Sequence, residues 1–148
     1  MRPFVSPGSV RRVVRWILGG VFLYAGILKM QDPQAFADRI ADFQILPFAL
    51  VNLLAISLPI AEILVGVLLM IEFWVECMAF AILLLTALFA MAIASALLRG
   101  LVIDCGCFGR GSPSVLKLLL ALGRDMLLGT MALFLLVGDW RNSRAPIG

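Results

Sequence analysis

The chain alternates long apolar stretches with short polar ones. Continuous apolar segments cover about residues 13–30, 45–71, 77–98 and 115–138. A helix that crosses a bilayer needs roughly 20 residues, and each segment is about that long or longer. The apolar runs are continuous and lack the alternation of a barrel strand. The pattern therefore predicts an all-α fold, an integral membrane four-helix bundle.

A short amphipathic helix is predicted between the first two spans, over about residues 33–44. Asp32 suits an N-cap and Pro33 a first helical residue. Phe36, Ile40 and Phe43 then recur at helical spacing, with charged residues on the other faces. Such a helix would lie in the membrane interface. An ordinary polar connection is the alternative.

Composition narrows the class of protein further. The chain is 63% hydrophobic and 14% charged, against about 45–50% and about 25% in soluble domains. The length suits one membrane domain over residues 1–148 with the lipid bilayer as its surroundings. Histidine is absent, which excludes imidazole metal sites and histidine base catalysis. A scattered net charge of +3 gives no nucleic-acid footprint.

The distribution of Lys and Arg predicts an orientation. Six positive residues flank the two chain ends, which four spans place on one side: Arg2, Arg11, Arg12, Arg15, Arg141 and Arg144. Five lie toward the other side: Lys29, Arg39, Arg99, Arg110 and Lys117. The first helix usually dominates orientation. We therefore expect a multi-pass protein of a bacterial inner membrane, with cytoplasmic termini and the loop between the third and fourth spans facing the periplasm.

That loop carries the chain's most distinctive motif, Cys105-Gly106-Cys107-Phe108-Gly109. Two thiols so close together can exchange with another disulfide, hold a soft ion such as Cu(I), or serve only as structural thiols. A bridge across one residue is strained and restricts little of the unfolded chain, which favours exchange over a structural staple. Arg110 would favour a thiolate, whereas Asp104 beside Cys105 opposes it.

The third cysteine, Cys77, lies at the opposite end of the third span. It is too far from the pair to join it, and we expect it to be buried and inert. No second pair of cysteines carries electrons across the membrane, so a redox role needs another protein or a quinone as electron partner.

Several ionisable residues fall inside the apolar segments. Glu62 lies near the middle of the second span, and Arg124 and Asp125 near the middle of the fourth. Charges at such depth face a protein partner or a cavity. Depth alone favours an ion pair of Glu62 with Arg124, and Asp125, about 100° away on the helix, would meet another group. Lys29 would either snorkel outward or turn inward to a carboxylate. A structural pair and a proton-handling role remain alternatives.

Several short motifs occur in order along the chain: Tyr24-Ala25-Gly26-Ile27-Leu28-Lys29, Asp32-Pro33, Leu58-Pro59-Ile60-Ala61-Glu62, Arg99-Gly100, Asp104-Cys105-Gly106-Cys107-Phe108-Gly109 and Arg124-Asp125. With these motifs in this order, the chain resembles the MauE branch of DoxX-like, redox-associated membrane proteins. The resemblance implies a periplasmic thioredoxin-like partner or a disulfide-containing client, such as the methylamine dehydrogenase small subunit.

Together these observations lead to a functional hypothesis. Cys105 and Cys107 would exchange thiols and disulfides with a periplasmic client during its maturation, which makes a thiol–disulfide oxidoreductase one candidate activity. Cu(I) binding by the same thiols and a non-catalytic role in assembly or export are the alternatives.

Overall fold

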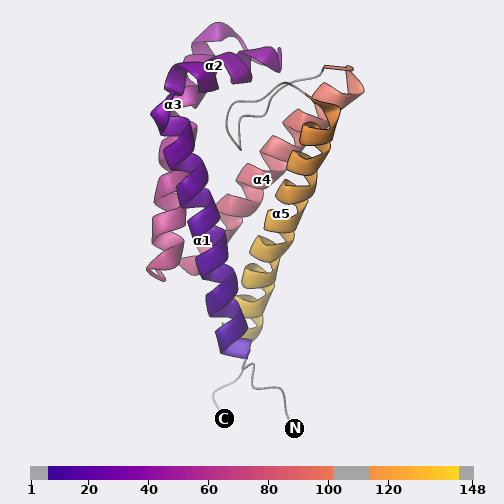
Figure 1. Cartoon of the computed structure of the whole chain (residues 1–148). Coiled ribbons are helices and arrows are strands. Elements are labelled where there is room, and N and C mark those ends of the chain that lie inside the picture. The colour runs from indigo at the N-terminus through magenta and orange to yellow at the C-terminus, as the bar shows by residue number, and fades with distance from the viewer. Residues whose placement is uncertain (1–6, 102–113, 144–148) are drawn as a thin grey trace, which may run out of the picture.

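Two closely packed helix pairs form the bundle. The computed structural model describes residues 7–101 and 114–143. In this part of the chain, α1 (Pro7–Gln31) packs mainly against α3 (Phe48–Met70), and α4 (Val75–Leu98) packs mainly against α5 (Val115–Ser143). Figure 1 shows the two pairs diverging toward the end that carries α2 (Pro33–Asp42).

The four predicted spans are confirmed. Four of the described helices are long and apolar enough to cross a membrane, over Gly8–Gln31, Phe48–Met70, Val75–Leu98 and Val115–Gly138. The first helix begins earlier than the apolar pattern predicts, at Pro7 instead of residue 13. Its additional residues include Arg11 and Arg12. Arginine is a good helix former although it is polar, so the helix continues where the apolar run does not.

The predicted short helix is also confirmed. Asp32 caps α2, because its carboxylate oxygen Oδ1 accepts a hydrogen bond from the backbone N–H of Ala35 at 3.0 Å. Pro33 occupies the first helical position, where its missing N–H costs nothing. The helix ends at Asp42, and Phe36 is its buried residue. One face of α2 therefore packs on the bundle.

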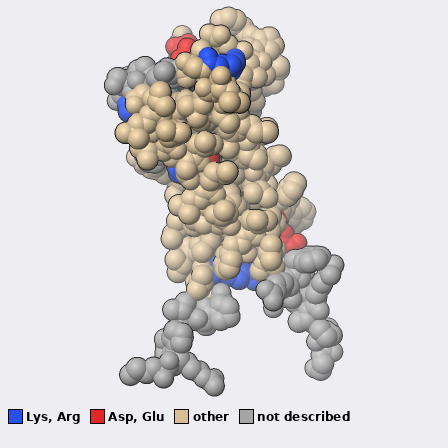
Figure 2. Space-filling model, turned by 90° about the vertical axis from the view of Figure 1, so that its right-hand side faces the viewer, with Lys and Arg blue, Asp and Glu red and all other residues tan. Residues whose placement is uncertain are grey.

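Contacts at the two ends of the bundle agree with the prediction that successive spans cross the membrane in opposite directions. At one end, Arg15 of α1 forms an ion pair with Glu72 in the turn between α3 and α4. At the other end, the Arg99 guanidinium donates to the backbone carbonyl of Phe43 at 2.5 Å. Figure 2 shows a face that is mostly uncharged, with its charged side chains gathered mainly toward the two ends.

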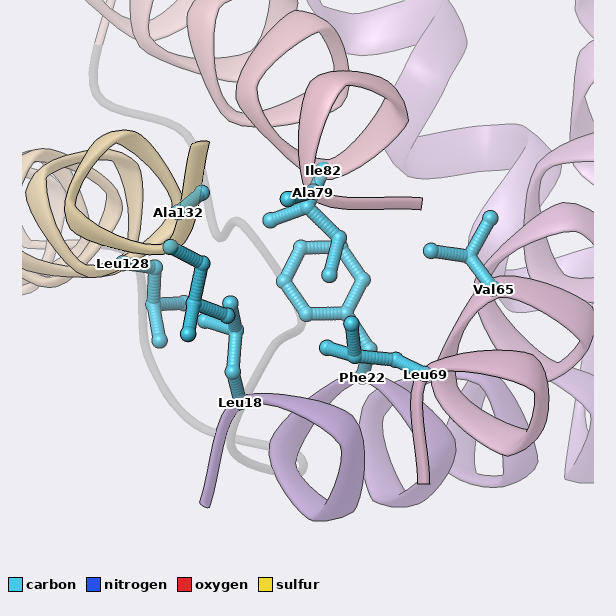
Figure 3. Packing of buried hydrophobic residues seen from close by; sticks show 9 residues of the cluster. Leu18, Phe22, Val65, Leu69, Ala79, Ile82, Leu128 and Ala132 are labelled. Carbon is cyan, nitrogen blue, oxygen red and sulfur yellow. The ribbon is translucent and has the colours of Figure 1, made fainter. Parts of the chain in front are cut away.

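The apolar core has two parts. The larger cluster joins all four long helices and comprises Leu18, Phe22, Val65, Leu69, Ala79, Ile82, Leu128, Ala132 and Leu135. In Figure 3 the Phe22 ring lies among Ile82, Val65 and Leu69. The smaller cluster joins α4 and α5 through Ile93, Ala96, Leu118 and Ala121, with Phe43 packed against it. On α5, the charged residues Arg124 and Asp125 described below lie between Ala121 of the smaller cluster and Leu128 of the larger one.

Glycines allow α1 and α3 to approach closely. A Cβ atom on Gly66 would lie 2.7 Å from the backbone oxygen of Gly19, and one on Gly26 would lie 2.9 Å from the backbone oxygen of Pro59. Real Cβ atoms do not approach oxygens so closely. Small residues at such positions are typical of helix pairs in membranes. This contact fixes how α1 and α3 are aligned, and thereby which side chains meet further along.

Candidate functional site

A buried ion pair joins the first two spans. Lys29 lies in the last turn of α1, and Glu62 lies within α3. The ammonium Nζ of Lys29 is 2.5 Å from Oε1 of Glu62, and both side chains are at least 95% buried. Lysine side chains on a helix lean toward its N-terminus, so the Lys29 ammonium reaches back from the helix end into the bundle. Of the two orientations expected for Lys29, the inward one is confirmed.

Two aromatic rings surround the same ammonium. Nζ of Lys29 lies 4.6 Å from the ring centroid of Phe89 on α4 and 5.2 Å from that of Phe36 on α2. Both distances are within the range of a cation–π interaction. The Lys29 ammonium therefore contacts side chains of α2, α3 and α4. A single charge thus connects the short helix with both helix pairs.

A second ion pair lies on α5. Oδ1 of Asp125 accepts from Nε of Arg124 at 3.1 Å and from a terminal guanidinium nitrogen at 2.7 Å. Asp125 is 4% exposed. It belongs to a buried stripe at helical spacing that includes Leu118, Ala121, Leu128 and Ala132. Arg124 is outside the stripe, and its side chain is 23% exposed.

Two predictions about these charges are wrong. Glu62 forms its ion pair with Lys29, not with Arg124. Asp125 is paired with its neighbour Arg124, although the two positions point in different directions on the helix. The depth of a residue along its helix does not identify its ion-pair partner, because the long side chains of Lys29 and Arg124 carry their charges well away from their own backbone positions. All four residues nevertheless gather at one place.

One small cavity brings the two ion pairs together. Its volume is about 30 Å³, and it is lined by Lys29, Glu62, Arg124 and Asp125 together with Val21, Phe22, Ala25, Thr86, Phe89 and Leu128. One carboxylate oxygen of each acid, Oε2 of Glu62 and Oδ2 of Asp125, is buried and has no hydrogen-bond partner among the described residues. The cavity therefore combines balanced charges with two unused acceptors.

The predicted site did not include Thr86 and Phe89. The Thr86 hydroxyl donates to the backbone oxygens of Ile82 and Leu83, at 2.9 and 3.0 Å, which leaves its own lone pairs available. Its buried position could have been found, because Ala79, Ile82 and Thr86 follow helical spacing on one face of α4. No comparable signal in the sequence marks Phe89 as a partner of Lys29.

The residues of the thiol motif lie outside the described part of the chain. These are Asp104, Cys105, Gly106, Cys107, Phe108, Gly109 and Arg110. The described residues on either side, Leu101 and Ser114, place the ends of this segment at the end of α4 and the start of α5. The C-terminal end of α2 is bound there through Arg99 and Phe43. The chain on either side of the motif is thus anchored near the short helix.

Cys77 differs from its prediction, because it is exposed and not buried. Cys77 lies near the start of α4, two residues before the buried stripe that starts at Ala79. Its side chain therefore points away from the core. Within residues 7–101 and 114–143, no group of three or more Cys, Asp or Glu side chains is arranged to hold a metal ion. Cys105 and Cys107, the predicted Cu(I) ligands, lie outside these residues.

Comparison with known proteins adds a family. Residues 8–138 match the family model described as methylamine utilisation protein MauE. The chain is 32% identical to methylamine utilization protein MauE of Paracoccus denitrificans over 93% of its own length and 74% of that protein. It is 33% identical to the protein of the same name from Paracoccus versutus, over 90% of the chain and 72% of the relative. No solved structure matches the chain.

Proposed function

Since the chain belongs to the family of methylamine utilisation protein MauE, we propose that it serves methylamine utilisation by thiol–disulfide exchange at Cys105 and Cys107. The client is a secreted protein that needs disulfides, with the methylamine dehydrogenase small subunit as the first candidate. A periplasmic thioredoxin-like protein is the alternative partner. The bilayer-spanning bundle holds the thiol pair at the membrane surface.

The observation that carries the proposal is the spacing of the two thiols in the segment between two spans. Cys105 and Cys107 are separated by a single glycine. A client thiolate attacks the Cys105–Cys107 disulfide, forms a mixed disulfide and releases one loop thiolate. A second client thiol then attacks the mixed disulfide, which leaves an oxidised client and a reduced loop. Two electrons and two protons pass from client to loop, so the exchange balances without another reactant.

Return of the loop to its disulfide form requires an electron acceptor. A quinone is one chemical class that suits a membrane protein: it would take two electrons and two protons from the thiols and leave as a quinol. A disulfide of a thioredoxin-like partner is the other class. Both belong to the proposal, and the sequence favours neither.

The proposal includes an orientation. The arginines at the start of α1 keep the chain ends in the cytoplasm, so that the segment between α4 and α5 faces the periplasm. Arg11, Arg12 and Arg15 are the residues concerned. Disulfides persist on that oxidising side of the membrane. The same orientation brings α2 to the periplasmic surface, beside the ends of the thiol segment.

The buried charges stabilise the arrangement of the helices that carry the thiol segment. Lys29 and Glu62 link α1 to α3, while the rings of Phe36 and Phe89 hold the same ammonium from α2 and α4. Removing either charge would leave the other unpaired inside the bilayer. Their proposed role is to fix the helices in register, so that α2 and the ends of α4 and α5 keep one arrangement.

The direct test is maturation of the client. The methylamine dehydrogenase small subunit is expressed with the wild-type chain, with Cys105→Ser or Cys107→Ser, and with Cys77→Ser as the matched control. Free thiols of the client are counted by maleimide mass tagging. We expect free thiols to accumulate with either loop variant and not with the control. Normal client disulfides with both loop variants would refute exchange.

The same variants separate the alternatives. An assembly factor without chemistry predicts that both serine variants keep client maturation whereas deletion of the loop abolishes it. A Cu(I) site predicts copper bound to the purified wild-type chain and lost in the double serine variant. Neither result is expected if the thiols act by exchange.

A further inference from the structure

Each buried acid in the bundle uses only one of its two carboxylate oxygens. Oε1 of Glu62 accepts from Lys29, and Oδ1 of Asp125 accepts twice from Arg124. The other two oxygens, Glu62 Oε2 and Asp125 Oδ2, are buried without a partner among the described residues. The two residues are 2% and 4% exposed. A buried acceptor without a partner is costly, and native proteins usually satisfy such atoms with an ordered water.

Both unused oxygens belong to residues that line the same cavity. Its volume of about 30 Å³ exceeds the roughly 10–15 Å³ that a water needs on the same measure. The cavity therefore has room for a water molecule.

Charge decides the chemical class of the ligand. The cavity is lined by two cations, Lys29 and Arg124, and two anions, Glu62 and Asp125. These charges cancel, so an additional ion would leave an uncompensated charge inside the membrane. A neutral molecule that donates two hydrogen bonds satisfies both free oxygens without that cost. Water is the neutral donor of the right size.

We propose that this cavity binds water, and that one water molecule donates to both Glu62 Oε2 and Asp125 Oδ2. The Lys29 ammonium has three N–H groups and uses one on Glu62 Oε1, so it can donate to the same water. Three hydrogen bonds are typical of a buried water. The water joins an ion pair of α1 and α3 to an ion pair of α5. It thus connects the two helix pairs inside the apolar layer.

Radiolytic labelling tests for this water directly. Hydroxyl radicals formed from a bound water oxidise the side chains that surround it, even inside a membrane protein. Phe89 lines the cavity, whereas Leu88 and Met91 are 50% and 60% exposed on the outer face of the same helix and serve as controls at similar depth. The full-length chain is exposed to X-ray pulses in lipid nanodiscs, and labelling rates are normalised to the intrinsic reactivity of each residue type.

We expect Phe89 to be labelled several-fold faster than Leu88 and Met91. A rate for Phe89 no higher than theirs would overturn the proposal. A second variant, Ala25→Leu, fills the cavity without removing a charge, and we expect it to reduce Phe89 labelling to the level of the controls. Ala87→Leu, on the exposed face of α4, is its matched control and should leave the Phe89 rate unchanged. Fast Phe89 labelling that persists in a folded Ala25→Leu chain would also contradict the proposal.

Discussion

Lys29, at the end of α1, forms a 2.5 Å ion pair with Glu62 inside α3. The pair places the only charged group of the last turn of α1 within the apolar layer, against two aromatic rings. Charged side chains at such depth are tolerated because they meet a partner there. Their removal one at a time therefore has a different effect from their removal together.

Replacement of Lys29 by Met should destabilise the bundle by about 3–5 kcal/mol, because it leaves the Glu62 carboxylate buried and unpaired. The double variant Lys29→Met, Glu62→Leu should recover a large part of this loss. Arg12→Met, at an exposed position of the same helix, should change little. Unfolding in mixed detergent micelles measures all of these variants. The single variant Glu62→Leu completes the comparison, and a double variant whose loss equals the sum of the two single losses would show that the pair is not coupled.

The close approach of α1 and α3 predicts a sharp difference between glycines. Gly66→Ala places a methyl group against the backbone of Gly19 and Leu23, and we expect a loss of about 1–3 kcal/mol from overpacking. At Gly20 a Cβ meets no described atom within 4 Å. Gly20→Ala should therefore leave stability unchanged or raise it by up to about 1 kcal/mol. Equal effects in thermal unfolding would contradict the described helix contact.

Attachment of α2 to the bundle depends in part on Arg99. Its guanidinium donates to the Phe43 carbonyl, just beyond the end of α2. Arg99→Gln should lower the free energy of opening at that end of α2 by about 1 kcal/mol. This corresponds to roughly fivefold faster amide exchange in residues 33–42. Hydrogen–deuterium exchange with mass spectrometry measures this rate. Arg39→Gln, on α2 itself, is the control. An equal acceleration of amide exchange in the Arg39→Gln chain would contradict a specific role of Arg99 in holding α2.

Most of the fold could be predicted from the sequence, because it depends on local patterns. Apolar length marks the four spans, and Asp32 with Pro33 marks the start of α2. The partners of the buried charges depend instead on the rotation of each helix and on side-chain reach. Asp125 lies in the Leu118–Ala121–Leu128 stripe, so its inward position was available from spacing. Its bond to Arg124 was not, because adjacent positions on a helix diverge and only a long side chain can fold back.

The glycine contact shows the same limit. Gly19, Gly20 and Gly26 look alike as residues in one helix, yet only Gly19 and Gly26 face the backbone of α3. Which glycine makes the contact depends on the alignment of two helices that are joined through α2. The sequence alone does not contain that alignment in any local pattern.

The proposed orientation can be measured with cysteine labelling in intact cells. In a Cys77→Ser chain, we expect a membrane-impermeant maleimide to label Cys105 or Cys107 after reduction, without permeabilisation of the inner membrane. In a chain that keeps only Cys77, we expect labelling only after permeabilisation, since α4 begins near that residue at the opposite end. The reverse pattern would place the thiol pair in the cytoplasm.

Thiol–disulfide exchange is reversible and passes through a mixed disulfide. In a chain with one loop cysteine, the remaining thiolate can attack a disulfide of the client, and no second loop thiol is present to resolve the mixed disulfide that forms. Each chain with a single loop serine, Cys105→Ser or Cys107→Ser, is expressed with the methylamine dehydrogenase small subunit in a Cys77→Ser background. Thiols are alkylated in acid, and the membranes are separated by non-reducing gel electrophoresis. We predict that at least one of the two chains forms a covalent complex with the client that disappears on reduction and is absent from the double serine variant. Absence of the complex from both single variants, at normal levels of chain and client, would contradict the thiol–disulfide account.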